Sequence, residues 1–247
     1  MNWQQPWIIG NWKMNGRRSS IAAFARAWAA QRLPENVSTG IAAPLPYLLD
    51  LKQASPALPI GAQDVSRFDK DGAFTGETSA AMLADLGVQF VLLGHSERRQ
   101  YFGENNETLS AKLDNTLAAG LIPILCVGET LAQRQVAQEQ AVVAEQLSVL
   151  RGKAMPHIAV AYEPVWAIGT GQVASAEQIA DMHAFIYAEL LSFANKSANI
   201  RALYGGSVNA QNAQTILTLP NVDGALVGGA SLQADSFAAI VQAAAKQ

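Results

Sequence analysis

Three side chains able to do acid–base chemistry stand just beyond short apolar runs of the chain. Lys13 and Asn11 follow a run that ends at Gly10, His95 follows a run that ends at Leu93, and Glu163 follows Tyr162 directly. In an α/β barrel, the segments that follow the strands gather at one mouth. We therefore expect an ammonium, an imidazole and a carboxylate to converge there.

Two glycine-rich segments follow later apolar runs and are suited to binding an anion. They are Tyr204-Gly205-Gly206-Ser207 and Gly228-Gly229-Ala230. Both are expected just before helices, where exposed backbone N–H groups and the helix dipole attract phosphate. The sequence thus predicts an anion site that faces the acid–base groups.

Each candidate also has a structural interpretation. Ser96 is expected to cap a helix whose first turn contains Glu97, so that His95 lies near the positive end of that helix, which disfavours an imidazolium. Glu97 alone can serve as a dipole-stabilising surface acid, Lys13 can be a solvated loop residue, and Asn11 can cap a turn. A charge at the end of an apolar strand is costly unless it is paired or reactive, so an ion pair is the alternative role for Glu163.

Eight short apolar runs alternate with helical stretches and predict a single (β/α)₈ barrel over residues 1–247. Runs of this kind recur at about the spacing of a βαβ unit and are apolar throughout, as is typical of parallel strands covered on both faces. The expected strands are Trp7 to Gly10, Thr39 to Ala43, Leu58 to Ala62, Phe90 to Leu93, Leu121 to Val127, Ile158 to Tyr162, Ile200 to Tyr204 and Gly224 to Val227.

Two local details test this prediction. Pro123 lies inside the fifth run, and proline is compatible with a central strand only near the start of that strand. Ser175 and Gln178 are expected to form a capping box for a helix whose apolar stripe includes Ile179, Met182 and Ile186.

Composition excludes several classes of protein. The net charge is −3 and half of the residues are hydrophobic, so we expect a large core and neither nucleic acid nor a membrane as partner. A single cysteine, Cys126, excludes an intrachain disulfide and fits a reducing, cytoplasmic location. The three histidines lack metal-ligand spacing. Gly169 to Ala174 matches a loose dinucleotide fingerprint, but it lies too far from the preceding strand for a nicotinamide site. Its place favours a lid with an apolar tip.

The motifs at the ends of the expected strands resemble those of the triosephosphate isomerase family. The resemblance rests on Gly10-Asn11-Trp12-Lys13-Met14-Asn15, Gly94-His95-Ser96-Glu97-Arg98-Arg99, Ala161 to Gly171, Tyr204-Gly205-Gly206-Ser207 and Val227-Gly228-Gly229-Ala230. These motifs run from one end of the chain to the other, each at the end of an expected strand.

The resemblance implies interconversion of dihydroxyacetone phosphate and D-glyceraldehyde 3-phosphate through an enediolate, in glycolysis and gluconeogenesis, without cofactor or metal. Glu163 would be the base and neutral His95 the group that serves the enediolate oxygens, with Lys13, Asn11 and Glu97 completing the catalytic set. Substrate and phosphate would be held by Asn11, Lys13, Gly169, Ser207, Gly228 and Gly229. The lid would comprise Pro164, Val165, Trp166, Ala167, Ile168, Gly169 and Thr170.

The resemblance also implies a homodimer. A long segment, here Asp64 to Thr78, would insert into a neighbouring subunit, with Met14 and Thr75 as contact residues. Asp64 stands where many family members have asparagine, and its added charge is expected to alter the polar contacts around Lys13.

Two other functions remain open on the residues alone. Another phosphate-binding barrel enzyme, such as a sugar-phosphate isomerase or an aldolase, would share the anion site, although a Schiff-base aldolase needs a strand lysine that Ile158 to Tyr162 lacks. A non-catalytic barrel that binds a phosphorylated metabolite would lack the base or the histidine, and both are present.

Overall fold

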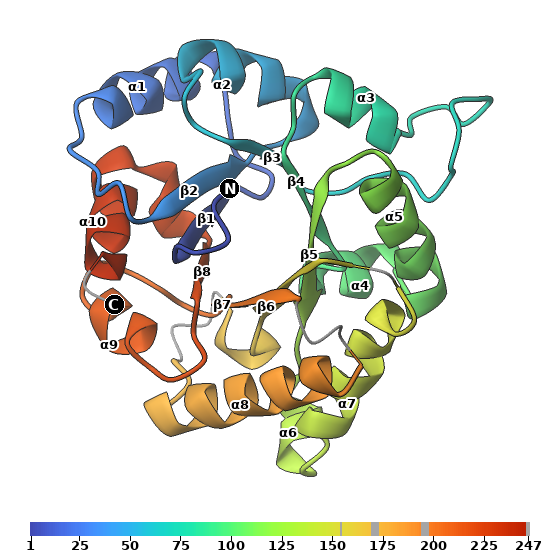
Figure 1. Cartoon of the computed structure of the whole chain (residues 1–247). Coiled ribbons are helices and arrows are strands. Elements are labelled where there is room, and N and C mark those ends of the chain that lie inside the picture. The colour runs from blue at the N-terminus through green and yellow to red at the C-terminus, as the bar shows by residue number, and fades with distance from the viewer. Residues whose placement is uncertain (154, 169–172, 194–197, 246–247) are drawn as a thin grey trace.

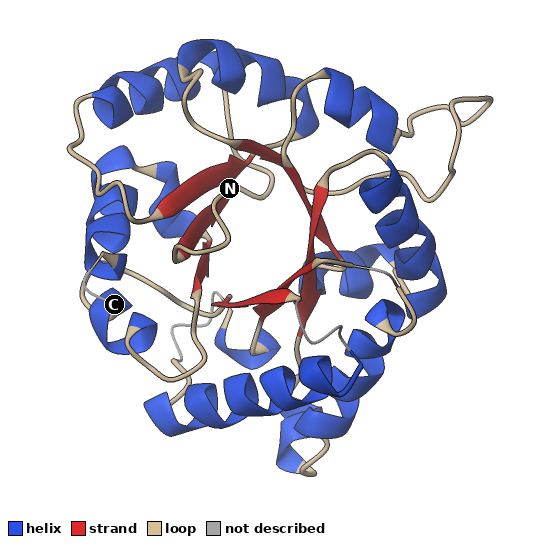
Figure 2. Ribbon diagram, in the orientation of Figure 1, coloured by secondary structure: helices blue, strands red, loops and turns tan. Residues whose placement is uncertain are grey.

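A computed structural model describes the chain except for residue 154 and residues 169–172, 194–197 and 246–247. Eight parallel strands close into a barrel in the order β1 to β8, with helices around the outside (Figures 1 and 2). The predicted fold class is confirmed. The strands are β1 Trp7–Asn11, β2 Ser38–Ala42, β3 Ile60–Ala62, β4 Phe90–Leu93, β5 Ile122–Val127, β6 His157–Tyr162, β7 Asn199–Tyr204 and β8 Gly224–Val227. All eight predicted runs form strands, with small differences at their ends.

The helices occupy the segments between strands. The α-helices are α1 Arg18–Ala29, α2 Leu48–Ala54, α3 Ala80–Asp85, α4 Ser96–Phe102, α5 Asn106–Ala118, α6 Leu131–Gln135, α7 Glu139–Leu147, α8 Ala176–Phe193, α9 Ala213–Leu217 and α10 Ala234–Ala244. Short 3₁₀ helices are η1 Leu45–Tyr47, η2 Ser148–Leu150, η3 Val165–Ala167 and η4 Gly229–Leu232.

Strand residues alternate between two separate apolar cores. Ile9 and Leu92 belong to a cluster inside the barrel, whereas their neighbours Ile8 and Val91 belong to the layer between the strands and the helices. Both sides of each strand are therefore dry. This explains why the runs are apolar throughout instead of alternating with polar residues.

Pro123 is accommodated near the start of β5, as predicted. The N–H of Ile122 donates to the Gln89 carbonyl on the β4 side, so the nitrogen of Pro123 faces β6. Pairing with β6 begins one residue later, at Ile124 and Ala159. The missing N–H thus falls at a position without a ladder partner.

The capping box of α8 is confirmed. The Ser175 N–H donates to Gln178 Oε1 at 2.9 Å, and the Gln178 N–H donates to Ser175 Oγ at 3.2 Å. The buried face of the helix contains Ile179, Met182 and Ile186, and also His183. The cap and the stripe fix where the segment after β6 re-enters regular structure.

Candidate active site

The loop after β1 holds Lys13 in an unusual backbone conformation. Lys13 has φ of 51°, in the left-handed region that costs a residue with a side chain about 1–2 kcal/mol. Asn11 Oδ1 accepts the Lys13 N–H at 3.0 Å, and Gln63 Nε2 donates to the Lys13 carbonyl at 3.0 Å. These bonds stabilise the strained turn. The Lys13 ammonium then reaches Glu97 Oε1 at 2.7 Å.

His95 itself caps helix α4, so the prediction that Ser96 is the cap was wrong. The Glu97 N–H donates to His95 Nδ1 at 3.2 Å, and Ser96 is the first helical residue. An N–H can only donate to a ring nitrogen that carries a lone pair. In the neutral ring the proton is therefore on Nε2, the nitrogen that faces Glu163.

Glu163 is almost fully buried beyond the end of β6, with both carboxylate oxygens engaged. Glu163 Oε1 lies 3.0 Å from His95 Nε2, and Glu163 Oε2 accepts a hydrogen bond from the Ser96 N–H at 3.0 Å. Its own N–H donates to the Val127 carbonyl of β5 at 2.7 Å. Three successive barrel strands thus fix one carboxylate.

The two groups shift each other's titration. Burial raises the pKa of Glu163, but the His95 contact and the Ser96 N–H more than offset this, so that its pKa lies below the usual range. Burial lowers the pKa of His95, but the facing Glu163 carboxylate raises this pKa by more than burial lowers it. The pKa of His95 therefore lies above its ordinary value. A buried base that stays ionised next to a proton donor is an arrangement for moving protons.

A cavity of about 300 Å³ joins the two halves of the predicted site. Its walls include Asn11, Lys13, His95, Glu163, Ser207, Gly228 and Gly229. Within the described residues, the backbone N–H groups of Ser207, Gly228 and Gly229 have no acceptor. Such donors are suited to binding an anionic oxygen.

Some predicted residues lie elsewhere. Glu97 lines a neighbouring cavity instead of this one, where it pairs with Lys13 and approaches His95 Nδ1 at 3.6 Å. Gly229 begins η4 as expected, but Ser207 does not directly precede a helix, because α9 starts only at Ala213. Gly169 and Thr170 lie outside the described residues.

The start of the predicted lid is fastened to the loop after β5. The Trp166 indole N–H donates to Glu129 Oε1 at 2.8 Å, and the Val165 N–H donates to the Glu129 carbonyl at 3.1 Å. At the other side, Ser207 Oγ donates to the Ala167 carbonyl at 2.8 Å. The segment therefore contacts the loop after β5, next to Glu163, on one side and Ser207 of the predicted anion site on the other.

Sequence reasoning missed two of these supporting residues. Gln63 holds the Lys13 backbone, and Glu129 accepts hydrogen bonds from the lid. Both stand one or two residues beyond the end of a strand, β3 and β5 respectively. The rule that identified Lys13, His95 and Glu163 would have identified them too.

Within the described residues, Asp64 forms no ion pair or hydrogen bond with Lys13. Its carboxylate pairs with Arg98 at 2.8 Å and with Lys112 at 2.6 Å. Burial raises the pKa of Asp64, and nearby Glu104 adds to the rise while Lys112 and Arg98 oppose it. The extra negative charge is thus absorbed by two cations of helices α4 and α5.

Comparison with known proteins places the chain among enzymes of one activity. The sequence model of triosephosphate isomerase matches residues 6–244. A triosephosphate isomerase of Neisseria meningitidis is 56% identical over 247 residues, covering 98% of both chains. The chain belongs to the triosephosphate isomerase family. Further triosephosphate isomerases, from Paracidovorax citrulli and Delftia acidovorans, are 48% and 46% identical, each over 96% of this chain and 98% of the relative.

Membership in the triosephosphate isomerase family decides between the functions that the residues left open. The chain is an intramolecular aldose–ketose isomerase, which excludes the aldolase and the non-catalytic barrel. In the described part of the chain, no helix has the length and hydropathy needed to cross a bilayer.

Proposed function

We propose that Glu163 is the general base of triose phosphate isomerisation and that His95 serves the substrate oxygens. One observation supports this most strongly: both side chains line the same cavity as three backbone N–H groups that have no acceptor in the part of the chain that the structure describes. A triose bound with its phosphate on those donors places its carbon chain between the carboxylate and the imidazole. Glu163 then takes a proton from one carbon and returns it to the next.

His95 works as a neutral imidazole in this proposal. To reach a substrate carbon, Glu163 leaves Nε2, and the contact that raises the pKa of His95 is lost. Burial and the positive charge of Lys13 then lower that pKa, and the Glu97 N–H still occupies Nδ1. Nε2–H is therefore free to donate to an enediolate oxygen and to move a proton between the two oxygens.

Lys13 and Asn11 stabilise the negative charge that develops on the substrate. Both line the cavity, and the strained turn presents the ammonium toward it. A fixed cation and donor of this kind act mainly on the transition state. Glu97 contributes by orienting the Lys13 ammonium, since it makes an ion pair with it from the adjacent cavity.

Phosphate binding and lid closure belong together in the proposal. The phosphate accepts from the backbone of Ser207, Gly228, Gly229 and Gly169, and the segment Pro164 to Thr170 closes over it. Closure requires Trp166 to exchange its bond with Glu129 for other contacts. Binding energy from the non-reacting phosphate drives this step, and exclusion of water protects the enediolate from losing phosphate.

Glu163→Gln tests the assignment of the base. We expect kcat for D-glyceraldehyde 3-phosphate to fall by at least about 100- to 10,000-fold, because a proton acceptor is lost while shape is kept. Affinity for inorganic phosphate, measured by titration calorimetry, should change little. A kcat close to that of the unmodified enzyme would refute the role of Glu163.

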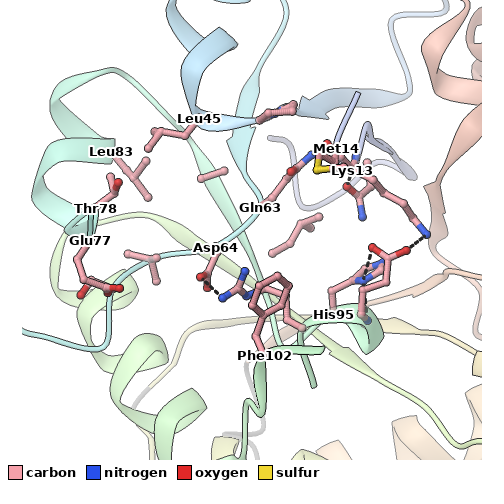
Figure 3. Close-up of a pocket in the computed structure, with 18 of the residues that line it drawn as sticks. Lys13, Met14, Leu45, Gln63, Asp64, Glu77, Thr78, Leu83, His95 and Phe102 are labelled. Atoms are coloured by element: carbon pink, nitrogen blue, oxygen red, sulfur yellow. Dashed lines mark hydrogen bonds and ion pairs between the residues drawn. The ribbon is translucent and has the colours of Figure 1, made fainter. Parts of the chain in front are cut away.

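We further propose that residues 1–247 form one catalytic domain that acts as a homodimer in the cytoplasm. A cavity of about 420 Å³ beside the active site is lined by Met14, Glu77, Thr78, His95 and Phe102, among other residues (Figure 3). Met14 is 95% exposed and Phe102 is 68% exposed, so a large apolar surface borders this cavity. The segment after β3 projects from the barrel and carries Thr75 (Figure 1).

The projecting segment is shaped for insertion into that cavity of a second copy. The rings of Phe68 and Phe74 stack at 3.6 Å, which stiffens the projection. Sedimentation at micromolar concentration should show two chains, and Met14→Glu should give monomers because it buries a charge at the contact. A fully active monomer of the unmodified chain would refute the dimer. The cytoplasmic location is supported by the buried free thiol of Cys126.

A further inference from the structure

A second cavity, of about 450 Å³, lies next to the active site, and Glu163 lines both. It is bounded by Ser96, Arg99 and Gln100 of α4, by Gly128 after β5, by Gln133 and Gln146, and by Val165 at the start of the lid. Its volume falls within the range of small-molecule sites. The isomerisation described above uses none of this space.

Arg99 supplies the cavity with a cation whose hydrogen bonds within the described residues all go to neutral acceptors. Its Nε donates to the Gly94 carbonyl at 2.8 Å, its Nη1 to Asn106 Oδ1 at 3.3 Å and its Nη2 to the Cys126 carbonyl at 3.2 Å. All three acceptors are neutral. Neighbouring arginines differ, since Arg98 pairs with Asp64 and Glu104, and Arg134 pairs with Glu129. Among the described residues no carboxylate forms an ion pair with Arg99.

The remaining donors of the cavity form a set for one carboxylate. Within the described residues Nη1 and Nη2 of Arg99 each have one acceptor, which leaves two N–H groups of the guanidinium to bind the oxygens of a carboxylate. Gln133 uses its Oε1 for the Thr130 N–H, and among the described residues its amide N–H groups have no acceptor, so they are available to a ligand. Val127 and Val165 provide apolar wall. Because Glu163 is also present, a monoanion is favoured over a dianion.

We propose that this cavity binds a small organic monocarboxylate through Arg99 and that its occupancy slows the isomerisation. The kinetic part rests on the role proposed for Glu163, whereas the binding part does not. The walls are joined directly to the base and the lid: a side chain on Gly128 would overlap the Glu163 carbonyl, with its Cβ only 1.7 Å from that oxygen. The Val165 N–H is held by Glu129. A ligand packed here restricts the movement of both segments.

Benzoate is a suitable probe because its ring fits the apolar wall, and benzamide is its neutral counterpart. We expect saturable benzoate binding in titration calorimetry, with weaker binding of benzamide, and a kcat that falls with benzoate while the substrate KM stays constant. Competition with substrate would instead place benzoate in the phosphate site and would overturn the proposal. Inorganic phosphate binding to the same cavity as tightly as benzoate would overturn the choice of a monocarboxylate.

Two variants test the site itself. Arg99→Lys keeps the charge but loses the paired donors and should weaken benzoate binding about tenfold. Gln100→Glu adds a negative charge at the exposed rim and should weaken it about two- to fivefold, without changing kcat in the absence of benzoate. Gln135→Glu is the matched control, since Gln135 is exposed in α6 but does not line the cavity.

Calorimetry measures benzoate binding and steady-state assays measure its effect on the rate. The binding part and the kinetic part of the proposal can therefore be refuted independently. Benzoate that binds through Arg99 without lowering kcat would refute the effect on isomerisation and leave the site. Binding that is equal in the unmodified enzyme, Arg99→Lys and Gln100→Glu would refute the site, as would the absence of saturable binding.

Discussion

Two buried histidines of this barrel have opposite properties. His95 lies at the mouth with a carboxylate 3.0 Å from Nε2, and its pKa is raised. His183 lies on the buried face of helix α8, where its Nδ1 is 2.9 Å from the Asn221 carbonyl oxygen and, within the described residues, its Nε2 has no hydrogen-bond partner. Burial lowers the pKa of His183 to about 4.

The comparison shows what turns a buried histidine into a reactive group. Burial disfavours the charged ring in both regions. At the mouth the Glu163 carboxylate opposes that effect and the ring lines a cavity that can admit a ligand, whereas burial dominates at His183. In the layer around His183 the neighbours are the rings of Tyr162 and Tyr204. The same residue type is thus structural or reactive according to what faces it.

The largest difference between the two histidines is expected when each is replaced by glutamine. His95→Gln should lower kcat/KM by about 100- to 10,000-fold, because a positioned proton donor is lost. His183→Gln should change kcat/KM only a few-fold. Steady-state assays on both variants, with circular dichroism to check folding, decide the matter. Equal losses in the two variants would contradict the distinction.

A second prediction uses the pH dependence of stability around His183. Its folded pKa of about 4 lies below the ordinary value of 6.5, so the unfolded chain binds the proton more readily. The contribution of His183 to the free energy of unfolding is therefore complete above pH 6.5 and is lost as the pH falls toward 4. We expect protonation of this residue to lower the free energy of unfolding by about 2 kcal/mol between pH 7 and pH 5.

Denaturant unfolding of the unmodified chain and of His183→Gln at both pH values measures this loss, since glutamine does not titrate. His157→Gln is the matched control, because the His157 ring is only half-buried. If the unmodified chain and His183→Gln lost the same free energy of unfolding between the two pH values, the assignment of His183 as a neutral buried ring would be wrong.

The smallest effect is expected at Asp64, which neighbours the mouth without facing it. Burial raises the pKa of Asp64 and so disfavours its charged form. This cost offsets part of the stabilisation that the ion pairs with Arg98 and Lys112 give. Asp64→Asn should change the free energy of unfolding at pH 7 by less than about 1 kcal/mol and leave kcat unchanged.

The sign with pH follows from the raised pKa. The stabilising contribution of Asp64 is present below its unfolded pKa and is lost as the pH rises through its folded pKa. The free energy of unfolding of Asp64→Asn, relative to that of the unmodified chain, should therefore be higher at pH 7 than at pH 4. Denaturant curves at fixed protein concentration measure both values. A loss above about 3 kcal/mol at pH 7 would mean that the carboxylate is essential to a buried ion pair.

Most of the fold could be predicted because it depends on local patterns. Apolar runs such as Phe90–Leu93 and Gly224–Val227 mark buried parallel strands, and the strand ends locate Lys13, His95 and Glu163. The capping of α4 could not be predicted, since serine is the usual cap and the orientation of the His95 ring depends on Glu163, which comes from a distant part of the chain. The partners of Asp64 depend on where α4 and α5 pack, which no local pattern encodes.

During isomerisation, Glu163 is proposed to remove a proton while His95 stays neutral, with its own proton on Nε2. Nitrogen NMR of ¹⁵N-histidine-labelled enzyme, with His95 assigned by comparison with His95→Gln, measures this directly when an enediolate mimic is bound. We expect one protonated ring nitrogen, Nε2, and one unprotonated nitrogen, Nδ1, at neutral pH. An imidazolium with both nitrogens protonated in that complex would contradict this expectation.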